Sequence, residues 1–246
     1  MTRSDFLALY EELLSRNGMG EHLGCGEVFF ALTERMLEVN EHLNLTAITE
    51  PAAVILRHYI DALTLAPLIP EGAAVADIGS GAGFPALPLC IARPDLRVTA
   101  IDGTGKRVRY MAETAELLGL SGRFTALTLR AEDGARDPAL RGKFDVVTAR
   151  AVAAMPLLSE LCLPYVKVGG LFLAMKSREA EAELVPASRA IRLLGGGDVA
   201  LEARQLTSPH EPEPLTRVIV SVRKLSQTPA IYPRDFIAKN NPPTFT

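Results

Sequence analysis

Apolar side chains recur at helical spacing through the first quarter of the chain. Residues 4–17 read SDFLALYEELLSRN and place apolar side chains three and four positions apart, which is the spacing of one helix face. The same spacing returns over residues 27–39 and 51–67, and Ser4 is placed to cap the first helix. The pattern therefore predicts a helical cap over residues 1–70 that packs on the rest of the chain.

From residue 73 the pattern changes to short apolar runs that alternate with longer helical segments. The runs predict strands over residues 73–78, 97–102, 124–129, 144–149 and 171–176. Helices are predicted over residues 84–92, 106–118, 135–141, 156–166 and 178–194. A regular alternation of strands and helices indicates a parallel sheet with right-handed crossovers and helices on both faces.

The last part of the chain lacks room for another crossover helix. Residues 199–206 and 217–224 have strand character, and the proline-rich segment SPHEPEPLT lies between them. Two strands joined in this way add an antiparallel edge to the sheet. The expected fold is therefore α/β and Rossmann-like, a mostly parallel seven-stranded sheet of the S-adenosylmethionine-dependent methyltransferase type. Its core is expected over residues 71–225, and a C-terminal tail over residues 226–246.

Charges are unevenly distributed, although the 246 residues carry a net charge of only −3. Residues 1–61 hold four arginines and ten acidic residues, whereas residues 217–246 hold five arginines or lysines and one aspartate. This balance argues against a cationic coat for nucleic acid and makes the C-terminal end the most basic segment.

The cysteines and the apolar runs limit the cellular location and the kinds of site that we expect. Cys25, Cys90 and Cys162 form an odd set with neither CxxC spacing nor a histidine cluster, so we expect neither disulfides nor a metal site. The sequence shows no long uncharged apolar run and no basic-then-apolar leader. We therefore expect a cytoplasmic protein that does not span a membrane.

One stretch, VADIGSGAGFPALPL at residues 75–89, combines the end of a strand with a glycine-rich turn. Asp77 lies at the end of the strand, and Gly79, Gly81 and Gly83 follow at alternate positions. Glycines at such a turn let the backbone bend tightly and approach a bound molecule. Ligands of doubly wound sheets bind at the carboxyl ends of the strands, so we expect a small-molecule site here.

Two cofactors fit this stretch. Asp102 ends the next strand, where a carboxylate can accept hydrogen bonds from the ribose hydroxyls of either NAD or S-adenosylmethionine. GAGFPA at residues 81–86 satisfies the GxGxxA pattern, which keeps an NAD-dependent reductase as an alternative. Asp77 would lie beside the pyrophosphate of NAD, whereas the ammonium and sulfonium groups of S-adenosylmethionine suit nearby carboxylates. These residues favour S-adenosylmethionine and methyl transfer.

Several linked motifs, in order along the chain, resemble one known family. They are NLT at 44–46, RHYID at 57–61, DIGSGAGFPALPL at 77–89, KR at 106–107, AE at 131–132, FDVVTARAV at 144–152 and GGLFLAMK at 169–176. In these motifs the chain resembles the bacterial ribosomal RNA small subunit methyltransferase G family, also called glucose-inhibited division protein B. The resemblance implies methylation of guanine N7 in 16S ribosomal RNA, with the small ribosomal subunit or its RNA as partner.

The resemblance also implies roles for particular residues. With the strand-end residues derived above, the residues expected to contact the cofactor are Asp77, Gly79, Gly81, Gly83, Phe84, Asp102, Gly103, Thr104, Ala131, Glu132 and Arg150. Among these, Asp102 with Gly103 and Thr104 would hold the ribose. Ala131 with Glu132 would contact the adenine.

The expected chemistry depends on positioning. Guanine N7 carries a lone pair and no proton, so it can attack a methyl group without a general base. TARAV follows the fourth predicted strand, where NPPY would indicate amine methylation and Pro-Cys would indicate methylation of pyrimidine carbon. Arg150 is the best candidate for orienting the base or the cofactor, and Cys162 is expected in the core.

Recognition of RNA requires contacts to phosphates and to exposed bases. Candidate contacts are Asn44, Thr46, His58, Lys176, Arg217, Arg223 and Arg234. We expect a monomer. A non-catalytic protein that binds RNA or assists ribosome assembly, built on the same fold, is a second alternative.

Overall fold

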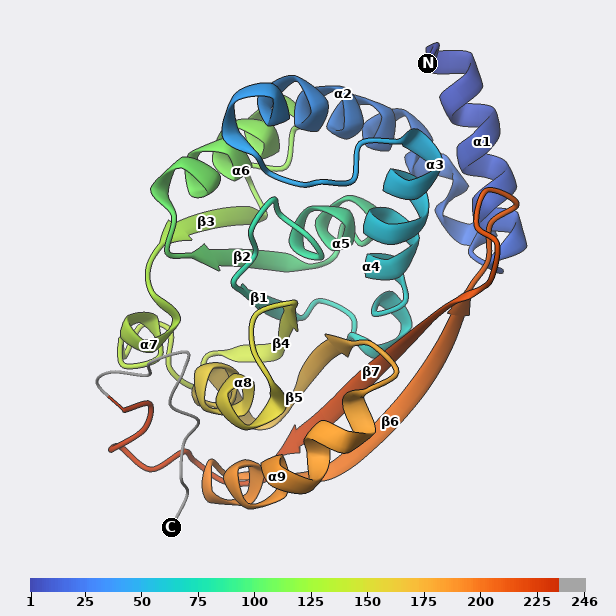
Figure 1. Ribbon diagram of the computed structural model, residues 1–246. Coiled ribbons are helices and arrows are strands. Elements are labelled where there is room, and N and C mark those ends of the chain that lie inside the picture. Colours follow the sequence, from blue (N-terminus) through green and yellow to red (C-terminus); the bar gives the residue numbers. More distant parts are fainter. Residues whose placement is uncertain (235–246) are drawn as a thin grey trace.

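A seven-stranded mixed sheet crosses the middle of the molecule (Figure 1). The structure is a computed structural model that describes residues 1–234. The strands are β1 (Ala74–Ile78), β2 (Arg97–Asp102), β3 (Phe124–Thr128), β4 (Phe144–Arg150), β5 (Val166–Lys176), β6 (Gly196–Leu206) and β7 (Leu215–Lys224). They lie in the order β3-β2-β1-β4-β5-β7-β6, with β7 antiparallel to both of its neighbours. This topology confirms the predicted fold class and its antiparallel edge.

The strand register brings the carboxyl ends of the parallel strands to one edge of the sheet. Ile78 of β1 pairs with Ile101 of β2 and with Ala149 of β4, while Arg150 pairs with Met175 of β5. The residues that follow these strands therefore meet at the same edge, which is where doubly wound sheets bind their ligands.

Helices cover both faces of the sheet (Figure 1). They are α1 (Arg3–Arg16), α2 (Gly26–Leu43), α5 (Ala86–Ala92), α6 (Gly105–Leu117), α7 (Ala131–Gly134), α8 (Met155–Cys162) and α9 (Ala180–Leu193). Successive strand residues point to opposite faces, so Val75 belongs to a core shared with α1, α2, α5 and α6, whereas Ala76 belongs to a core shared with α8 and α9.

The first helix is shifted by one residue from its predicted range, and the second is longer than its pattern indicated. Thr2, and not Ser4, caps α1, because its hydroxyl accepts from the Asp5 N–H while the Asp5 carboxylate accepts from the Thr2 N–H. Helix α2 continues to Leu43, four residues past the predicted end, and Asn44 then ends it in the left-handed conformation with φ 48°.

The segment predicted as one helix over 51–67 contains several helical geometries. It comprises α3 (Pro51–Val54), a π-helical stretch η2 (Ile55–Ile60), α4 (Asp61–Leu63) and a 3-10 turn η3 (Ala66–Leu68). Glu50 caps the start, since its carboxylate accepts from the Ala53 N–H at 2.8 Å. The π-helical stretch carries Arg57 and His58, and π-helical turns recur at functional sites.

Four predicted elements were wrong in extent. Residues 135–141 form turns after the four-residue α7, and not a helix. The helix predicted over 156–166 ends at Cys162; a 3-10 turn η4 (Leu163–Tyr165) containing Pro164 leads directly into β5, because proline cannot supply the N–H that a continuing helix needs. Strand β5 consequently begins at Val166, five residues before its predicted start. Strand β6 begins at Gly196, three residues before its predicted start.

The apolar core crosses the proposed boundary at residue 70. Phe6 and Leu13 of α1 belong to the same buried cluster as Val75 and Val98 of the sheet. The division into a cap, a core and a tail stays a prediction, and residues 235–246 of the predicted tail lie outside the described residues. Within residues 1–234, no helix is long and apolar enough to cross a membrane.

Candidate functional site

The glycine-rich loop after β1 is held against the end of β2. Gly79 donates its N–H to the Ile101 carbonyl at 2.8 Å, and Gly79, Gly81 and Gly83 have φ values of 71°, 58° and 87°. A Cβ on Gly79 would lie 2.6 Å from Val152 Cγ2, whereas one on Gly81 would have its nearest neighbour, the Gly79 carbonyl oxygen, at 3.9 Å. Gly81 thus leaves open space beside its backbone, as a ligand-facing position requires.

Asp102 fixes the shape of this loop from the end of β2. Its carboxylate accepts from the Gly81 N–H at 3.0 Å and from the Thr104 N–H at 2.8 Å. Asp102 is 8% exposed, while Gly103 and Thr104 next to it are exposed. A carboxylate has about four lone-pair sites, so Asp102 keeps acceptor capacity for a ligand.

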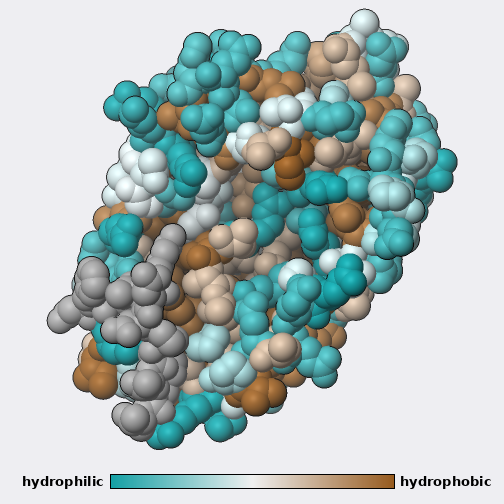
Figure 2. Space-filling view, viewed as in Figure 1, coloured by the Kyte–Doolittle hydropathy of each residue, from teal (hydrophilic) through white to brown (hydrophobic). Residues whose placement is uncertain are grey.

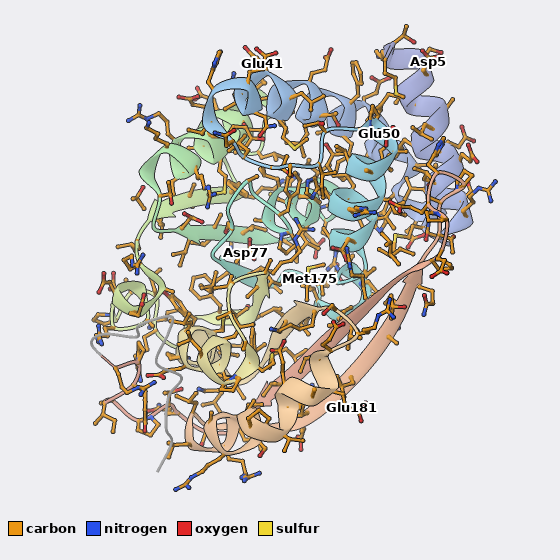
Figure 3. The ribbon with its side chains drawn as sticks, in the orientation of Figure 1. Asp5, Glu41, Glu50, Asp77, Met175 and Glu181 are labelled. Atoms are coloured by element: carbon orange, nitrogen blue, oxygen red, sulfur yellow. The ribbon has the colours of Figure 1, made fainter. Side chains whose placement is uncertain are left out.

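Asp77 carries an unsatisfied buried oxygen beside the same loop. It is 1% exposed, its Oδ1 accepts from the Thr148 hydroxyl at 2.8 Å, and its Oδ2 has no hydrogen-bond partner. Burial raises the pKa of this carboxyl to about 6. Figure 3 places Asp77 near the middle of the molecule, in contrast to the peripheral Asp5 and Glu181. An unsatisfied buried acceptor at a strand end is suited to a ligand that donates hydrogen bonds.

A small, mainly apolar pocket of about 140 Å³ lies beside Asp102. It is lined by Gly103, Arg130, Ala131, Glu132, Val152, Ala153, Leu157 and Leu161. The Tyr165 hydroxyl donates to the Ala131 carbonyl at 2.7 Å and fixes α7 at the pocket wall. Gly134 is required for this contact, because a Cβ there would lie 2.4 Å from Tyr165 Oη. An apolar wall with few polar groups suits a flat heterocyclic base.

A larger cleft of about 470 Å³ lies beyond Arg150. It is lined by Ile48, Arg57, His58, Asp61, Arg150, Ala151, Met175, Lys176, Ser177, Glu183 and Arg217. Without counting His58, four of these side chains are cationic and two are acidic. The face shown in Figure 2 is hollowed near its centre and bordered by both hydrophilic and hydrophobic residues. The excess of positive charge suits an anionic ligand.

The connection between β4 and α8 separates the two cavities. Ala151 lines the larger cleft and Val152 lines the smaller pocket, so one step along the backbone passes from one to the other. The Val152 side chain also lies against the glycine loop at Gly79. A ligand in the small pocket and a second ligand in the cleft would therefore be close neighbours.

Arg150 is anchored on the cleft side by the π-helical segment. Its Nη1 donates to the Arg57 carbonyl at 2.8 Å and to Asp61 Oδ2 at 3.1 Å. Its guanidinium carbon lies 5.6 Å from the centre of the Phe84 ring. These contacts hold the guanidinium in one orientation between the glycine loop and the cleft.

His58 is buried against Phe84 and is neutral at physiological pH. Burial, together with the charge of Arg150, lowers the pKa of His58 to about 3. Its Nδ1 lies 3.3 Å from Arg150 Nη2, and its Nε2 lies 3.0 Å from Thr46 Oγ1. Because arginine only donates, Nδ1 is the acceptor and Nε2 carries the proton toward Thr46.

Asp61 joins two arginines of the cleft. Its side chain is 3% exposed, with Oδ2 3.1 Å from Arg150 Nη1 and Oδ1 3.3 Å from Arg217 Nε. Sequence reasoning did not single out Asp61, although its position three residues after His58 on a helical segment places both on one face. The acid is thus a central part of the site.

Lys176 and Arg57 also line the cleft and are paired with acids. Lys176 Nζ donates to Glu183 Oε2 at 2.7 Å and to the Ala153 carbonyl at 2.8 Å. Arg57 donates twice to Glu211 Oε1, at 2.9 and 2.6 Å. Glu211 lies between β6 and β7, so the hairpin tip forms part of the cleft's surroundings. Sequence reasoning missed Glu211, which is separated from its partner by 154 positions.

The remaining candidate residues are distributed unevenly. Asn44 is exposed at the end of α2, two residues before Thr46. Arg223 pairs in register with Leu171, near the opposite end of β5 from Lys176, and donates to the Gly169 carbonyl. Arg234 is bound to the buried Glu160. The structure therefore brings neither Arg223 nor Arg234 to the cleft, and the roles assigned to all these residues stay predictions.

Solved structures share this fold. An O-methyltransferase from Bacillus cereus in complex with SAH aligns with a TM-score of 0.55 at 19% identity, covering 79% of this chain and 91% of its own. TYW2 of M. jannaschii in complex with AdoMet gives 0.52 at 16% identity, covering 68% and 75%. At these identities the likeness concerns the fold, which is that of S-adenosylmethionine-dependent methyltransferases.

Sequence relatives are much closer. The family model described as rRNA small subunit methyltransferase G matches residues 27–210. Ribosomal RNA small subunit methyltransferase G of Lactobacillus delbrueckii subsp. bulgaricus is 43% identical over 96% of this chain and 98% of its own. The protein of the same name from Geobacillus thermodenitrificans is 42% identical over 92% and 93%. Together with the fold, these relatives favour methyl transfer over the NAD-dependent alternative, and the chain belongs to the ribosomal RNA small subunit methyltransferase G family.

Proposed function

We propose that this protein transfers a methyl group from S-adenosylmethionine to N7 of a guanine in the 16S ribosomal RNA of the small subunit. The observation that carries the proposal is the pair of adjacent cavities on either side of residues 151–154, one small and apolar, the other larger and cationic. Such a pair suits a nucleoside cofactor beside an RNA substrate. A ribosomal RNA substrate would also mean that the protein acts in the cytoplasm.

The residues at the strand ends fit S-adenosylmethionine. The unsatisfied Oδ2 of Asp77 suits the ammonium group, and Asp102 keeps lone pairs for the ribose hydroxyls. Ala131 and Glu132 would border the adenine in the small pocket. These carboxylates would repel a phosphate group, but S-adenosylmethionine contains none.

When bound, S-adenosylmethionine supplies an electrophilic methyl group on a positively charged sulfur. The protein's own task is then to align the guanine, because N7 carries no proton to remove. His58 fits this absence of proton transfer, since a pKa of about 3 makes its imidazole a weak base. Cys162 is fully buried with a thiol pKa well above its ordinary value, so it is no nucleophile for a pyrimidine mechanism.

Arg150 is the residue we assign to orientation at the boundary of the two cavities. Its guanidinium is held by Asp61, by the Arg57 carbonyl and by the Phe84 ring, so it presents a fixed array of donors. A fixed donor array can orient an acceptor edge of guanine without a change in protonation. Arginine retains its charge throughout, which suits a positioning role and no acid-base role.

The cationic cleft would receive the RNA around the target guanine. Arg57, Lys176 and Arg217 are each paired with an acid, and a phosphate can compete for such partly exposed cations. Guanine N7 lies in the deep major groove of A-form RNA, which side chains cannot enter. The target is therefore a loop or an otherwise unpaired guanine.

The test is methyl transfer from labelled S-adenosylmethionine to small ribosomal subunits and to naked 16S ribosomal RNA, followed by mapping of the modified base. The wild-type protein should label guanine N7 in at least one substrate. Arg150→Ala should lose activity roughly a hundredfold or more, as expected when a fixed electrostatic contact is removed.

Arg35→Ala is a matched control, because the Arg35 side chain is similarly buried and is likewise paired with acids, here Glu38 and Glu113, away from the cleft. It should retain full activity. Cofactor binding without methyl transfer to either RNA would support the non-catalytic assembly alternative. Methylation at another base or atom would overturn the assignment of the substrate.

A further inference from the structure

The segment after β7 is bound to α8 and to the turn after α7, and these two helices border the small pocket. Residues 228–234, here called the strap, continue from the end of β7 toward α7, where Figure 1 shows the red part of the chain. The Thr228 hydroxyl donates to the Leu194 carbonyl at 2.7 Å, and Lys224 Nζ donates to the Leu194 and Leu163 carbonyls at 2.7 and 2.8 Å. The start of the strap is thus held by hydrogen bonds to the backbone at Leu163 and Leu194.

One end of the strap is joined to α8 by a buried acid. Glu160 is 0% exposed, and its Oε1 accepts from the Arg234 backbone N–H at 2.9 Å and from Nε at 3.0 Å. Its Oε2 accepts from Arg234 Nη2 at 2.7 Å. A fully buried carboxylate needs such a partner, so α8 and the strap are held together.

The same segment is joined to the turn after α7 by two arginines. Arg136 Nη2 donates to the Pro233 carbonyl at 2.8 Å, and Arg141 Nη1 donates to the Tyr232 carbonyl at 2.8 Å. Arg141 Nη1 also donates to the Ala135 carbonyl at 2.8 Å, directly after α7. Arg141 therefore connects the strap to the end of α7.

Helices α7 and α8 form two walls of the small pocket. Ala131 and Glu132 come from α7, and Leu157 and Leu161 come from α8. A helix of four residues has little stability of its own, so the position of α7 depends on outside contacts. Within residues 1–234, the pocket lining contains no member of the strap.

We propose that the strap, through the Glu160–Arg234 pair and the arginines that follow α7, sets the spacing between α7 and α8 and thereby the affinity for the adenine of S-adenosylmethionine. Arg234 is then a positioning residue for the cofactor and no RNA contact. This inference rests on the proposed function, because it assigns the small pocket to the adenine.

The experiment measures S-adenosylhomocysteine binding by isothermal titration calorimetry, with full-length protein at a temperature where every variant is folded. Arg234→Ala should weaken binding roughly tenfold to a hundredfold, the range that a misplaced binding wall produces. Arg234→Lys keeps the charge but loses the two-pronged contact, so it should fall between wild type and Arg234→Ala.

A steady-state measurement separates positioning from a general loss of structure. In Arg234→Ala the KM for S-adenosylmethionine should rise while kcat at saturating cofactor stays within about twofold, since only ground-state positioning of the cofactor changes. Arg16→Ala is the matched control, because Arg16 is a partly exposed arginine paired with Glu12 on α1. It should change neither constant.

The double variant Glu160→Gln/Arg234→Ala distinguishes the loss of the strap contact from the cost of leaving the buried Glu160 carboxylate unpaired. This double variant leaves no unpaired carboxylate at position 160, so it should be more thermally stable than Arg234→Ala. It should still bind S-adenosylhomocysteine weakly. Wild-type affinity in either Arg234→Ala or the double variant would overturn the inference. Failure of the wild-type protein itself to bind S-adenosylhomocysteine would overturn the proposed function.

Discussion

The His58 and Phe84 rings lie nearly parallel, with centroids 4.2 Å apart and an angle of 3° between their planes. His58 belongs to the π-helical segment before the sheet, and Phe84 belongs to the glycine-rich loop after β1. The stack joins the two segments at the point where Arg150 also contacts Phe84. One aromatic side chain thus supports both the glycine-rich loop and the cleft.

Replacement of Phe84 by alanine should affect both stability and activity. Phe84 is 4% exposed, and loss of a buried phenylalanine costs about 3 kcal/mol in the free energy of unfolding. Chemical denaturation measures that cost, and methyl transfer per folded molecule should also fall. Phe6→Ala in α1 removes a ring that is 1% exposed and should lower stability alone. Equal activity of the two variants would contradict the role of the stack.

His58 should make the protein less stable as the pH falls. Its pKa is about 3 in the folded state, below its value of about 6.5 in an unfolded chain, so the unfolded state binds its proton first. The stability that His58 contributes is complete above pH 6.5 and is lost toward pH 3, with a slope of at most about 1.4 kcal/mol per pH unit.

Urea denaturation between pH 7 and pH 4, compared with His58→Asn, isolates this contribution. The wild type should lose more unfolding free energy than the variant over that range. Asp77 has a raised pKa of about 6 and gives the opposite slope, but it is present in both proteins and cancels in the difference. Parallel pH profiles would show that His58 does not titrate in this way.

Asp61→Asn should disturb two arginines at once. Arg150 and Arg217 would lose their shared carboxylate, at a cost of about 2 kcal/mol, because both arginines are partly exposed and a fully buried pair would cost more. Thermal denaturation checks the stability. Methyl transfer should fall roughly a hundredfold as Arg150 loses its orientation. A further Arg217→Gln substitution should recover stability without activity, and recovery of both would argue against the role of Asp61.

Two glycines of the loop should respond differently to alanine. Gly79→Ala meets Val152 at 2.6 Å, so it should destabilise the fold by about 2 kcal/mol or more, and Val152→Ala should recover part of that loss. Gly81→Ala has open space but a φ of 58°, so it should cost only about 1 kcal/mol. Calorimetric titration should nevertheless show weaker cofactor binding in Gly81→Ala. Unchanged binding there would place the cofactor elsewhere.

The parts that could be predicted from sequence are those with local signals. The apolar run ending at Asp77, followed by three alternate glycines, indicated both the first strand and its loop. The proline-rich connection at 208–216 indicated the antiparallel edge, because proline excludes a crossover helix there. Propensity and periodicity act over a few residues, and these features lie within that range.

The missed features depend on contacts between distant segments. Glu211 and Glu160 find their arginine partners 154 and 74 positions away, and no periodic pattern marks such pairs. The composition of residues 135–141 permits the predicted helix, whereas contacts of Arg136 and Arg141 with the strap define the turns that form there. Long-range pairing overrides weak local preference.

Asn17, at the end of α1, exchanges two hydrogen bonds with the backbone of Thr207, which lies 190 positions later at the end of β6. During synthesis from the N-terminus, α1 emerges first but cannot gain this contact until the hairpin has been made. Closing so long a loop is slow and entropically costly. Final docking of the first helix is therefore a late step of folding, completed only when the last strands have left the ribosome.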